Sequence, residues 1–281
     1  MNTLDLINYG TKKLKQKKIT SYRLDSELLL SKVLNKNREE ILINLDQEIS
    51  KKYLATYKKL IIRRSQNEPV AYILREKEFW SKFFFVSYDT LIPRPETELM
   101  VEKLVKIFSE KKISILDIGT GCGCILISLL SELDTSRGIG IDISKKALVI
   151  ARKNLEKHKL KNKIKFINKS LDSKFHQKFD LIVSNPPYIK SNEIKNLQED
   201  IKKYEPKIAL DGGNDGLDLI KKVIYKTTYI LKIKGSLALE IGNEQFRKVS
   251  KLLTKNNFKI EYSIKDYKDN IRCVISTYLG K

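Results

Sequence analysis

The sequence is poor in cysteine, histidine and long apolar runs. It contains three cysteines and two histidines among 281 residues, and no stretch approaches the roughly 18 apolar residues that are typical of a transmembrane helix. The first residues, Met1 to Ile7, lack the basic segment followed by an apolar one that marks a secretory signal. These absences predict a cytoplasmic chain without a membrane segment.

The scarcity of cysteine and histidine also limits the kinds of site that the chain can build. Cys122, Cys124 and Cys273 are odd in number, and a single residue separates the first two. They are more typical of reduced thiols than of a disulfide framework. The two histidines supply no zinc-ligand spacing, so we expect no metal site.

Basic residues, by contrast, are abundant. The formal net charge is +21, from 55 Lys or Arg and 34 Asp or Glu. Such a charge is typical of nucleic-acid-binding proteins. However, residues 1–70 contain 15 Lys or Arg and 8 Asp or Glu, a net +7, so the excess is spread along the chain. A compositional bias toward lysine explains this pattern equally well, and charge alone does not identify the substrate.

Three regions differ in their sequence pattern. Residues 1–75 carry leucine and isoleucine at helical spacing, with Ser50 placed to cap a helix that runs toward Arg64. This region has no nucleophile or glycine loop, and we expect a small helical domain that docks a partner. Residues 76–90 are rich in aromatic and β-branched side chains, which predicts a hairpin linker. Residues 91–281 begin with a proline-rich helix entry and form the third region.

Short strands and amphipathic helices alternate along the third region. Strands are predicted over residues 113–117, 138–142, 164–167, 179–184 and 236–241. Helices are predicted over residues 125–133, 145–158, 217–231 and 244–255. The alternation predicts an α/β fold with a doubly wound, mostly parallel sheet. Two further strands, 258–264 and 272–278, follow one another without a helix, which predicts an antiparallel edge.

A glycine-rich loop, Asp117-Ile-Gly-Thr-Gly-Cys-Gly123, follows the first predicted strand of this sheet. Glycines at such a position permit positive φ and let a cofactor approach the backbone. Asp142 ends the next strand, where an acid can accept hydrogen bonds from ribose hydroxyls. The Gly-x-Gly-x-Gly spacing departs from the dinucleotide fingerprint and favours S-adenosylmethionine. Taken alone, the glycine loop fits a tight structural turn or a dinucleotide site equally well, and Asp142 fits a helix N-cap.

The tetrapeptide Asn185-Pro186-Pro187-Tyr188 follows another apolar strand. Two consecutive prolines form a stiff elbow without N–H donors. The Asn185 side-chain oxygen and the Pro186 carbonyl are then acceptors beside the Tyr188 ring, which suits a planar NH2 group such as that of adenine, cytosine or glutamine. The alternative is a proline turn with a surface tyrosine. Because parallel strands end at one crevice, we expect the elbow and the glycine loop to share a site.

These motifs resemble those of S-adenosylmethionine-dependent class I methyltransferases, and most closely the peptide chain release factor glutamine methyltransferases (the PrmC/HemK family). The tetrapeptide by itself also fits enzymes that methylate adenine in DNA. The longer segments are more specific, and together they span nearly the whole chain. The matching segments are Asp25-Ser-Glu-Leu-Leu-Leu30, Glu78-Phe-Trp80, Leu91-Ile-Pro-Arg-Pro-Glu-Thr-Glu98, Asp117–Gly123, Asn185–Tyr188 and Tyr204-Glu-Pro-Lys-Ile-Ala-Leu-Asp-Gly-Gly-Asn-Asp-Gly-Leu217.

The resemblance implies a fold, a reaction and a partner. The fold is a seven-stranded class I methyltransferase sheet with an antiparallel edge, joined through a hairpin to an N-terminal helical domain. The cofactor is S-adenosylmethionine, and the substrate is the glutamine in the Gly-Gly-Gln loop of peptide chain release factors. Such a reaction takes place in the cytoplasm and requires neither a membrane nor nucleic acid.

The resemblance also assigns roles to residues of this sequence. It implies that the residues that bind S-adenosylmethionine are Gly119, Thr120, Gly121, Cys122, Gly123, Asp142, Ser170 and Asn185. It implies that the catalytic and substrate-binding residues are Asn185, Pro186, Pro187 and Tyr188.

One departure from the family concerns the loop after the third strand of the sheet. The family often has an acid there, near adenine, followed by a large apolar residue, whereas this chain has Lys169-Ser170. We expect Ser170 to contact the cofactor through its backbone, with Asp172 as the alternative if the loop is shifted.

Three other functions stay open at this stage. A ribosomal-protein glutamine methyltransferase would use the same chemistry on another protein. An adenine amino-group methyltransferase would act on nucleic acid, in line with the tetrapeptide and the charge. A cofactor-binding scaffold for translation factors would carry out no reaction.

Overall fold

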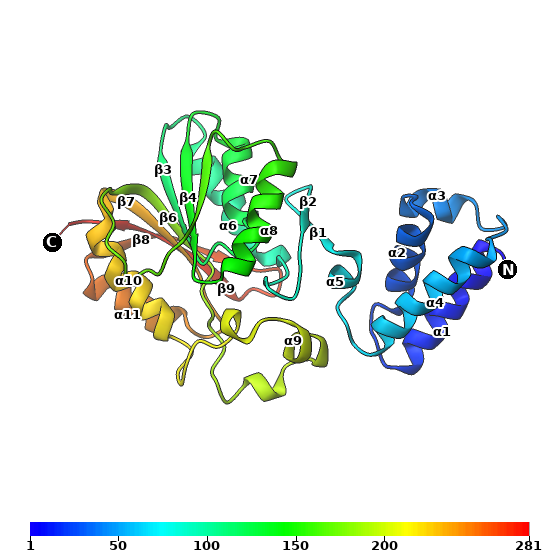
Figure 1. Cartoon of the computed structure of the whole chain (residues 1–281). Helices are drawn as coiled ribbons and strands as arrows, with labels where there is room; N and C mark the ends of the chain where they lie inside the picture. Colours follow the sequence, from blue (N-terminus) through cyan, green and yellow to red (C-terminus); the bar gives the residue numbers. More distant parts are fainter. Residues whose placement is uncertain (281) are drawn as a thin grey trace. The chain divides into compact units, whose positions relative to one another are not determined.

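The chain forms two compact units in a computed structural model that describes residues 1–280 (Figure 1). The first unit contains Met1–Glu76 and a returning segment, Gln198–Tyr204, and the remaining described residues form the second unit. The sequence analysis placed residues 198–204 within the 91–281 region, whereas the structure groups them with the N-terminal helices. Across residues 1–280, every helix is too short or too polar to traverse a bilayer.

The first unit is a helical bundle with a leucine-, isoleucine- and tyrosine-rich core. The helices α1 and α3 each begin at a reciprocal cap, in which Asn2 or Asn37 and an acid three residues later exchange hydrogen bonds. The helix α4 begins directly after Ser50, as predicted. The helices of this unit are α1 (Thr3–Gln16), α2 (Tyr22–Leu34), α3 (Arg38–Ile43), α4 (Lys51–Ser65), α5 (Val70–Leu74) and α9 (Glu199–Tyr204).

Buried polar side chains tie the helices of the first unit together. Asp25 on α2 pairs with Arg64 on α4 at 2.7 Å, and both side chains are almost fully buried. The Ser26 hydroxyl lies 2.7 Å from the Tyr57 hydroxyl and donates to the Ile7 carbonyl at 2.8 Å. The Asp25-Ser-Glu segment therefore has a structural role, because each of these buried groups requires a partner within the bundle.

A two-stranded hairpin, β1 (Glu76–Phe79) and β2 (Lys82–Phe85), precedes the large sheet. Its connection is the pair Trp80 and Ser81, with φ of 54° and 52°, as a two-residue hairpin turn requires. The Asn154 side chain accepts from the Phe85 N–H at 2.7 Å and donates to the Phe85 carbonyl at 3.0 Å. These two bonds attach the hairpin to helix α8.

The second unit is built on a seven-stranded sheet of order β5-β4-β3-β6-β7-β9-β8. Its first five strands in the chain run parallel, and β9 is antiparallel to both β7 and β8. The predicted doubly wound, mostly parallel sheet with an antiparallel edge is therefore confirmed. The strands are β3 (Ser114–Ile118), β4 (Arg137–Asp142), β5 (Ile164–Asn168), β6 (Phe179–Ser184), β7 (Leu231–Glu240), β8 (Phe258–Lys265) and β9 (Ile271–Tyr278).

The start of β7 is the main error in the predicted boundaries. The sequence predicts a helix that reaches residue 231 and a strand from residue 236, but β7 already begins at Leu231. Its first residues are Leu-Lys-Ile-Lys-Gly, and Lys234 has a φ of 64°, so the pattern is typical of a loop. The pairing of Phe179 with Leu231 nevertheless extends the strand, across a register irregularity.

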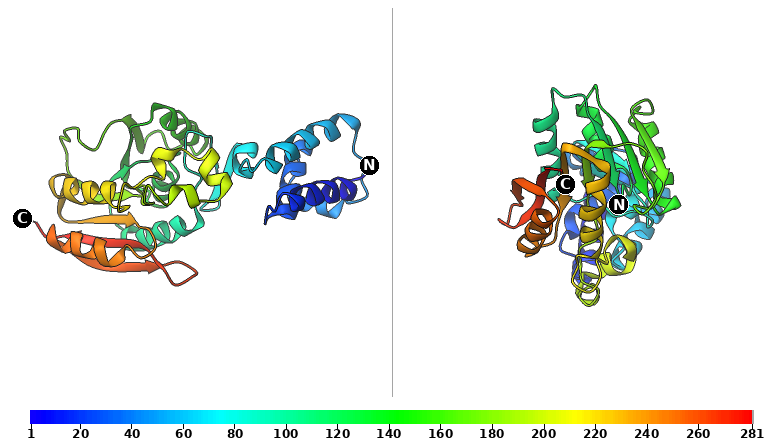
Figure 2. Two further views of the ribbon diagram at one scale, coloured as in Figure 1. Left: turned by 90° about the horizontal axis from the view of Figure 1, so that it is seen from below. Right: turned by 90° about the vertical axis from the view of Figure 1, so that its left-hand side faces the viewer.

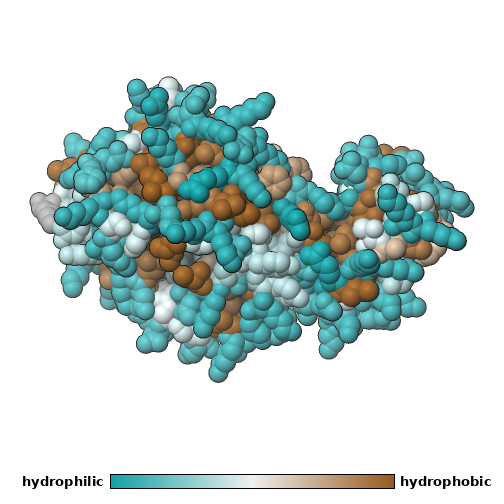
Figure 3. Space-filling view, viewed as in Figure 1, coloured by the Kyte–Doolittle hydropathy of each residue, from teal (hydrophilic) through white to brown (hydrophobic). Residues whose placement is uncertain are grey.

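Helices cover both faces of the sheet, and each face has its own apolar core (Figure 2). One core joins the sheet to α6 (Pro95–Phe108), α7 (Cys124–Glu132) and α8 (Lys145–Lys157). The other joins it to α10 (Asp218–Ile230) and α11 (Phe246–Lys255). The outer side chains are mostly hydrophilic on the face that Figure 3 shows, in line with the abundance of lysine. Strand β3 lies between β4 and β6, so the loops after these three strands meet at one edge.

Candidate active site

A pocket of about 240 Å³ lies in the second unit, at the carboxyl ends of β3, β4 and β6. The glycine loop and the Asn185-Pro-Pro elbow both line it, as expected of loops that leave neighbouring parallel strands. Of the residues predicted to form the site, those that line the pocket are Gly119, Thr120, Gly121, Cys122, Asp142, Ser170, Asn185, Pro186 and Pro187. Gly123 and Tyr188 are not among its lining residues.

The glycine loop has the backbone conformation that its sequence predicts. Gly119, Gly121 and Gly123 have φ of 72°, 55° and 83°. A Cβ added at Gly119 would meet no atom within 4 Å, so the backbone at this point borders open space. The Gly119 and Thr120 N–H groups donate to the Ile141 carbonyl at 2.9 and 3.0 Å, which fixes the loop against β4. The loop therefore leaves exposed backbone along one wall of the pocket.

Asp142 connects the glycine loop to the next loop of the sheet. Its carboxylate accepts from the Gly121 N–H at 2.9 Å and from the Ser144 N–H at 2.8 Å, one bond at each oxygen. A carboxylate oxygen has two lone pairs, so both oxygens can accept another hydrogen bond. Asp142 can therefore hold the loop and still bind hydroxyl groups in the pocket.

Asp117, at the start of the glycine motif, lies behind the pocket wall. Its side chain is 1% exposed and accepts from the Thr120 hydroxyl at 2.6 Å. Burial raises the pKa of Asp117 to about 7, and the Thr120 hydrogen bond offsets this only in part. Asp117 is not among the lining residues, so Thr120 stands between this carboxyl group and the pocket.

The loop after β5 contributes Lys169, Ser170 and Leu171 to the pocket wall. Asp172, the alternative acid, has an exposed carboxylate that pairs with Lys222 at 2.5 Å and with Lys226 at 3.5 Å. The Lys222 hydrogen bond lowers the pKa of Asp172. Asp172 is not among the lining residues of the pocket, whereas Ser170 is.

Asn185 and Pro186 of the elbow both line the pocket, and each carries an oxygen that can accept a hydrogen bond. The Asn185 side-chain nitrogen donates to the Thr97 hydroxyl oxygen at 3.4 Å. Among residues 1–280, no donor reaches Asn185 Oδ1 or the Pro186 carbonyl oxygen. These are the two atoms that the sequence analysis assigned to a planar NH2 group. The site thus combines exposed backbone, an acid and a pair of amide acceptors in one cavity.

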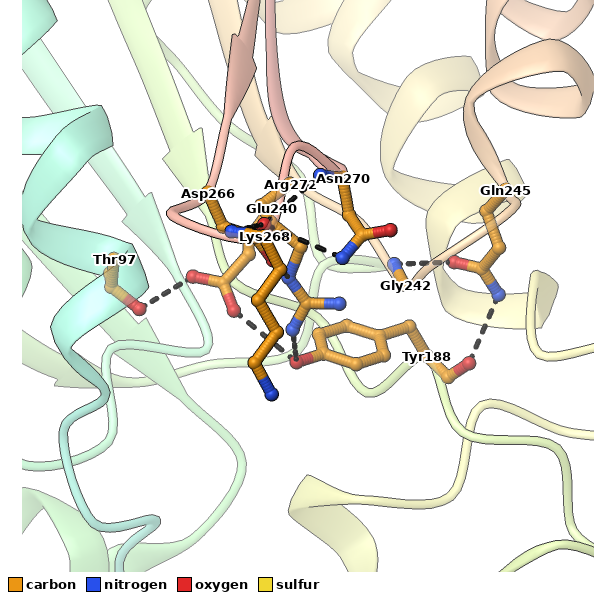
Figure 4. Close-up of polar contacts among 9 residues, drawn as sticks. All are labelled: Thr97, Tyr188, Glu240, Gly242, Gln245, Asp266, Lys268, Asn270 and Arg272. Carbon is orange, nitrogen blue, oxygen red and sulfur yellow. Dashed lines mark hydrogen bonds and ion pairs between the residues drawn. The ribbon is translucent and has the colours of Figure 1, made fainter.

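Tyr188 belongs to a hydrogen-bond network next to the pocket (Figure 4). Its hydroxyl accepts from Arg272 at 3.0 Å and donates to Glu240 at 3.4 Å. Burial and the nearby Glu240 carboxylate raise the pKa of Tyr188, so the hydroxyl stays protonated. A stacking role for its ring toward a substrate stays a prediction.

Residues 210–216, far along the chain, pack against the end of the Asn185–Tyr188 elbow. Gly212 has no room for a side chain, since a Cβ there would lie 2.8 Å from the Pro187 carbonyl oxygen. Ile189, directly after the tetrapeptide, donates its N–H to the Leu210 carbonyl at 3.1 Å, and its carbonyl accepts from the Gly212 N–H at 2.8 Å. Gln245 adds a bond to the Tyr188 carbonyl at 3.0 Å (Figure 4). Residues 210–216 and Gln245 thus hold the end of the tetrapeptide through Tyr188 and Ile189.

Comparison with known proteins identifies the family. The PrmC N-terminal domain family matches residues 5–74, and the Methyltransferase small domain family matches residues 94–266. The chain is 44% identical over 268 residues to the release factor glutamine methyltransferase of Buchnera aphidicola subsp. Schizaphis graminum, covering 95% of this chain and 97% of that protein. The chain belongs to the release factor glutamine methyltransferase family.

Further relatives agree with this assignment. The Fusobacterium nucleatum release factor glutamine methyltransferase is 38% identical over 277 residues, which cover 97% of this chain and 78% of that protein. Among solved structures, the catalytic domain of hMettl16, crystallised with an RNA hairpin, matches with a TM-score of 0.57 at 14% identity. That match covers 85% of this chain and 87% of the other. At this identity the likeness shows the methyltransferase fold alone.

Several residues around this methyltransferase site were not predicted as site residues. Glu205 is buried and accepts from the Ile92 N–H at 3.2 Å and from Arg94 at 2.5 Å. It thereby ties together two segments that both line the pocket. Glu240 and Thr97 contact each other, and each contacts one residue of the tetrapeptide. A lone acid at the end of an apolar strand was the available signal for Glu240. Within residues 1–280, no cluster of His, Cys, Asp or Glu is arranged to hold a metal ion.

Proposed function

We propose that this methyltransferase transfers a methyl group from S-adenosylmethionine to the side-chain amide nitrogen of the glutamine in the Gly-Gly-Gln motif of peptide chain release factors. The observation that carries the proposal is the shared pocket, which the glycine loop and the Asn185-Pro-Pro elbow both line. Methyl transfer requires donor and acceptor side by side. The names of the relatives supply the class of substrate.

The residues of the pocket fit S-adenosylmethionine. The open backbone from Gly119 to Gly121 would hold the amino-acid part of the molecule, and the spare lone pairs of Asp142 would accept ribose hydroxyl groups. Ser170 and its neighbours would face the adenine ring, next to apolar side chains such as Leu171. When bound, this cofactor supplies an electrophilic methyl group on a sulfonium sulfur.

The elbow would orient the glutamine side chain. A primary amide has two N–H bonds in one plane, and Asn185 Oδ1 and the Pro186 carbonyl oxygen would accept one each. The amide nitrogen is a poor nucleophile, because its lone pair is conjugated with the carbonyl. Accepting both N–H bonds would shift electron density toward the nitrogen and hold it in line with the methyl group. Such positioning can lower a barrier by up to about 7–11 kcal/mol.

The first unit would dock the release factor. This helical unit contains no candidate catalytic group, and it exposes apolar side chains that a protein partner could cover. They include Leu24, Ile43 and Ile62, which are 45%, 81% and 54% exposed. A substrate of this kind would place the reaction in the cytoplasm, where translation is terminated.

Methyl transfer to a panel of acceptors tests the proposed function. Purified protein is incubated with S-adenosylmethionine carrying a labelled methyl group and with a release factor, a ribosomal protein, DNA or RNA in turn. We expect label on the release factor alone. Label on the ribosomal protein would support the other protein substrate. Label on nucleic acid, with none on protein, would make the chain an adenine methyltransferase.

Asn185→Ala is the matched variant for this experiment. Asn185 is partly exposed, and its side chain makes a single long hydrogen bond at 3.4 Å, so the variant should fold almost as well as the wild type. We expect it to lose turnover by on the order of 10²-fold or more. A scaffold without catalytic activity would instead show no turnover in the wild type either.

A further inference from the structure

Glu240 is a buried acid that the reaction, as proposed, does not use directly. It ends the apolar strand β7 and is 1% exposed. Its Oε2 accepts from the Thr97 hydroxyl at 2.5 Å, and its Oε1 accepts from the Tyr188 hydroxyl at 3.4 Å (Figure 4). A buried carboxylate is costly unless it is paired. Here its partners contact or belong to the Asn185–Tyr188 elbow.

The single hydroxyl hydrogen of Thr97 decides how Asn185 is turned. Thr97 Oγ1 lies 2.5 Å from a carboxylate oxygen of Glu240, so its hydrogen is committed to Glu240 in a short, charge-assisted bond. Thr97 Oγ1 can then only accept a hydrogen bond from its other neighbour. Asn185 must therefore present its NH2 group to Thr97, as the 3.4 Å contact from Nδ2 shows. The Asn185 oxygen is then the other end of the planar amide group, which does not contact Thr97.

The cation beside Glu240 reinforces this direction. Burial, and to a smaller extent Glu96, raise the pKa of Glu240, while the Thr97 hydroxyl, Arg272 and the Tyr188 hydroxyl lower it in part. Arg272 donates to the Tyr188 hydroxyl at 3.0 Å, and its guanidinium carbon lies 5.4 Å from the centre of the Tyr188 ring. Arg272 also lies 3.8 Å from Asp266. A cation held at this point favours the carboxylate form of Glu240, which can only accept hydrogen bonds.

We propose that Glu240 and Thr97 are positioning residues, which together orient the Asn185 side-chain amide so that its oxygen, and not its NH2 group, faces the substrate amide. The proposal rests on the proposed function, in which Asn185 Oδ1 accepts an N–H from the substrate. Turned the other way, the Asn185 NH2 group would meet the substrate NH2 group, and two donors would face each other.

Thr97→Val and Thr97→Ser test the proposal as a matched pair. Valine has nearly the shape of threonine but no hydroxyl, so it neither bonds Glu240 nor accepts from Asn185. Serine keeps both bonds. We expect Thr97→Val to lower kcat by on the order of 10-fold to 10²-fold and to leave the Kd of S-adenosylhomocysteine unchanged. We expect Thr97→Ser to retain kcat within about 3-fold.

A second measurement reads the amide orientation without turnover. In the ligand-free wild-type protein, nuclear Overhauser contacts should connect the Asn185 side-chain NH2 protons to the Thr97 methyl group, because Nδ2 is the atom next to Thr97. Because this measurement uses the wild-type protein, it tests the proposal even if Thr97→Val does not fold.

The outcomes separate this proposal from the proposed function. An Asn185 NH2 group that shows no contact with Thr97 overturns the positioning proposal, and so does a folded Thr97→Val protein with wild-type kcat. A wild-type protein that methylates no release factor would remove the proposed function instead. In that case the Overhauser contact would still decide whether Thr97 sets the orientation of Asn185.

Discussion

At the scale of single residues, Asp117 is the group in this site whose protonation the fold changes most clearly. Its carboxyl group is 1% exposed, and burial raises its pKa to about 7. In an unfolded chain an aspartate titrates near about 3.9. Between these values the folded protein binds the proton and the unfolded chain does not. The contribution of Asp117 to stability is therefore fully present below about pH 4 and is lost as the pH rises through about 7.

Asp117→Asn should remove this pH dependence. We expect the free energy of unfolding of the variant, relative to the wild type, to rise by on the order of 4 kcal/mol between pH 4 and pH 8. Asparagine can still accept from the Thr120 hydroxyl, so the local geometry should persist. Urea unfolding at a series of pH values measures the difference. A stability difference that does not change with pH would show that Asp117 is ionised in the folded protein throughout.

Residues of the pocket wall were easier to predict from the sequence than the residues that contact them from outside it. Asn185 and Pro186 were expected at the pocket, and do line it, because an Asn-Pro-Pro-Tyr elbow after a strand is a local pattern with direct chemical meaning. Thr97 and Glu240 lie 143 positions apart, and only the fold brings them together. The sequence contains both residues but no local signal that they share a hydrogen bond.

At the scale of elements, the buried pair of Asp25 and Arg64 joins α2 to α4 in the first unit. Removing one partner should leave an uncompensated buried charge. We expect Arg64→Ala to destabilise the first unit by about 3–5 kcal/mol. Arg23→Ala is the control, because the Arg23 side chain is 71% exposed and its pair with Glu27 should contribute at most about 1 kcal/mol. Circular dichroism during urea unfolding measures both. Equal effects of the two variants would contradict a structural role for the buried pair.

Gly212 should be essential to the elbow, because a Cβ there would lie 2.8 Å from the Pro187 carbonyl oxygen and 2.9 Å from the Tyr188 Cα. We expect Gly212→Ala to displace the elbow and to lower kcat by on the order of 10²-fold. The exposed neighbour Asn214 provides the control, and Asn214→Ala should leave methyl transfer unchanged. A Gly212→Ala protein with the kcat of the wild type would show that the close packing of Gly212 does not position the elbow.

The order of strands and helices in the second unit was predictable because buried strands and amphipathic helices differ in period. The prediction failed where tertiary pairing decided the structure. β7 begins at Leu231 because that residue pairs with Phe179, although the segment Lys-Ile-Lys-Gly resembles a loop. Residues 198–204 were placed in the 91–281 region because of their position in the sequence. In the structure they group with the first unit, where the Tyr204 hydroxyl donates to the Gln66 carbonyl at 3.1 Å.

At the scale of the whole molecule, the two units should respond differently to a ligand. Every residue that lines the pocket belongs to the second unit. S-adenosylhomocysteine at 100 times its Kd should therefore stabilise that unit by about 2.7 kcal/mol. The unfolding transition of the first unit, which can be recognised because Arg64→Ala shifts it, should not change when the ligand binds. Hydrogen exchange with and without the ligand distinguishes the units. Equal protection of both would show that the chain unfolds as one cooperative body.

The most direct test of the central claim is the location of the transferred methyl group. A release factor is incubated with the protein and S-adenosylmethionine, and tandem mass spectrometry is applied to the peptide that contains Gly-Gly-Gln. The proposed function predicts one added methyl group on the side-chain nitrogen of that glutamine, and none when glutamic acid replaces it. An unmodified glutamine after incubation with active protein, or a methyl group at any other residue, would contradict it.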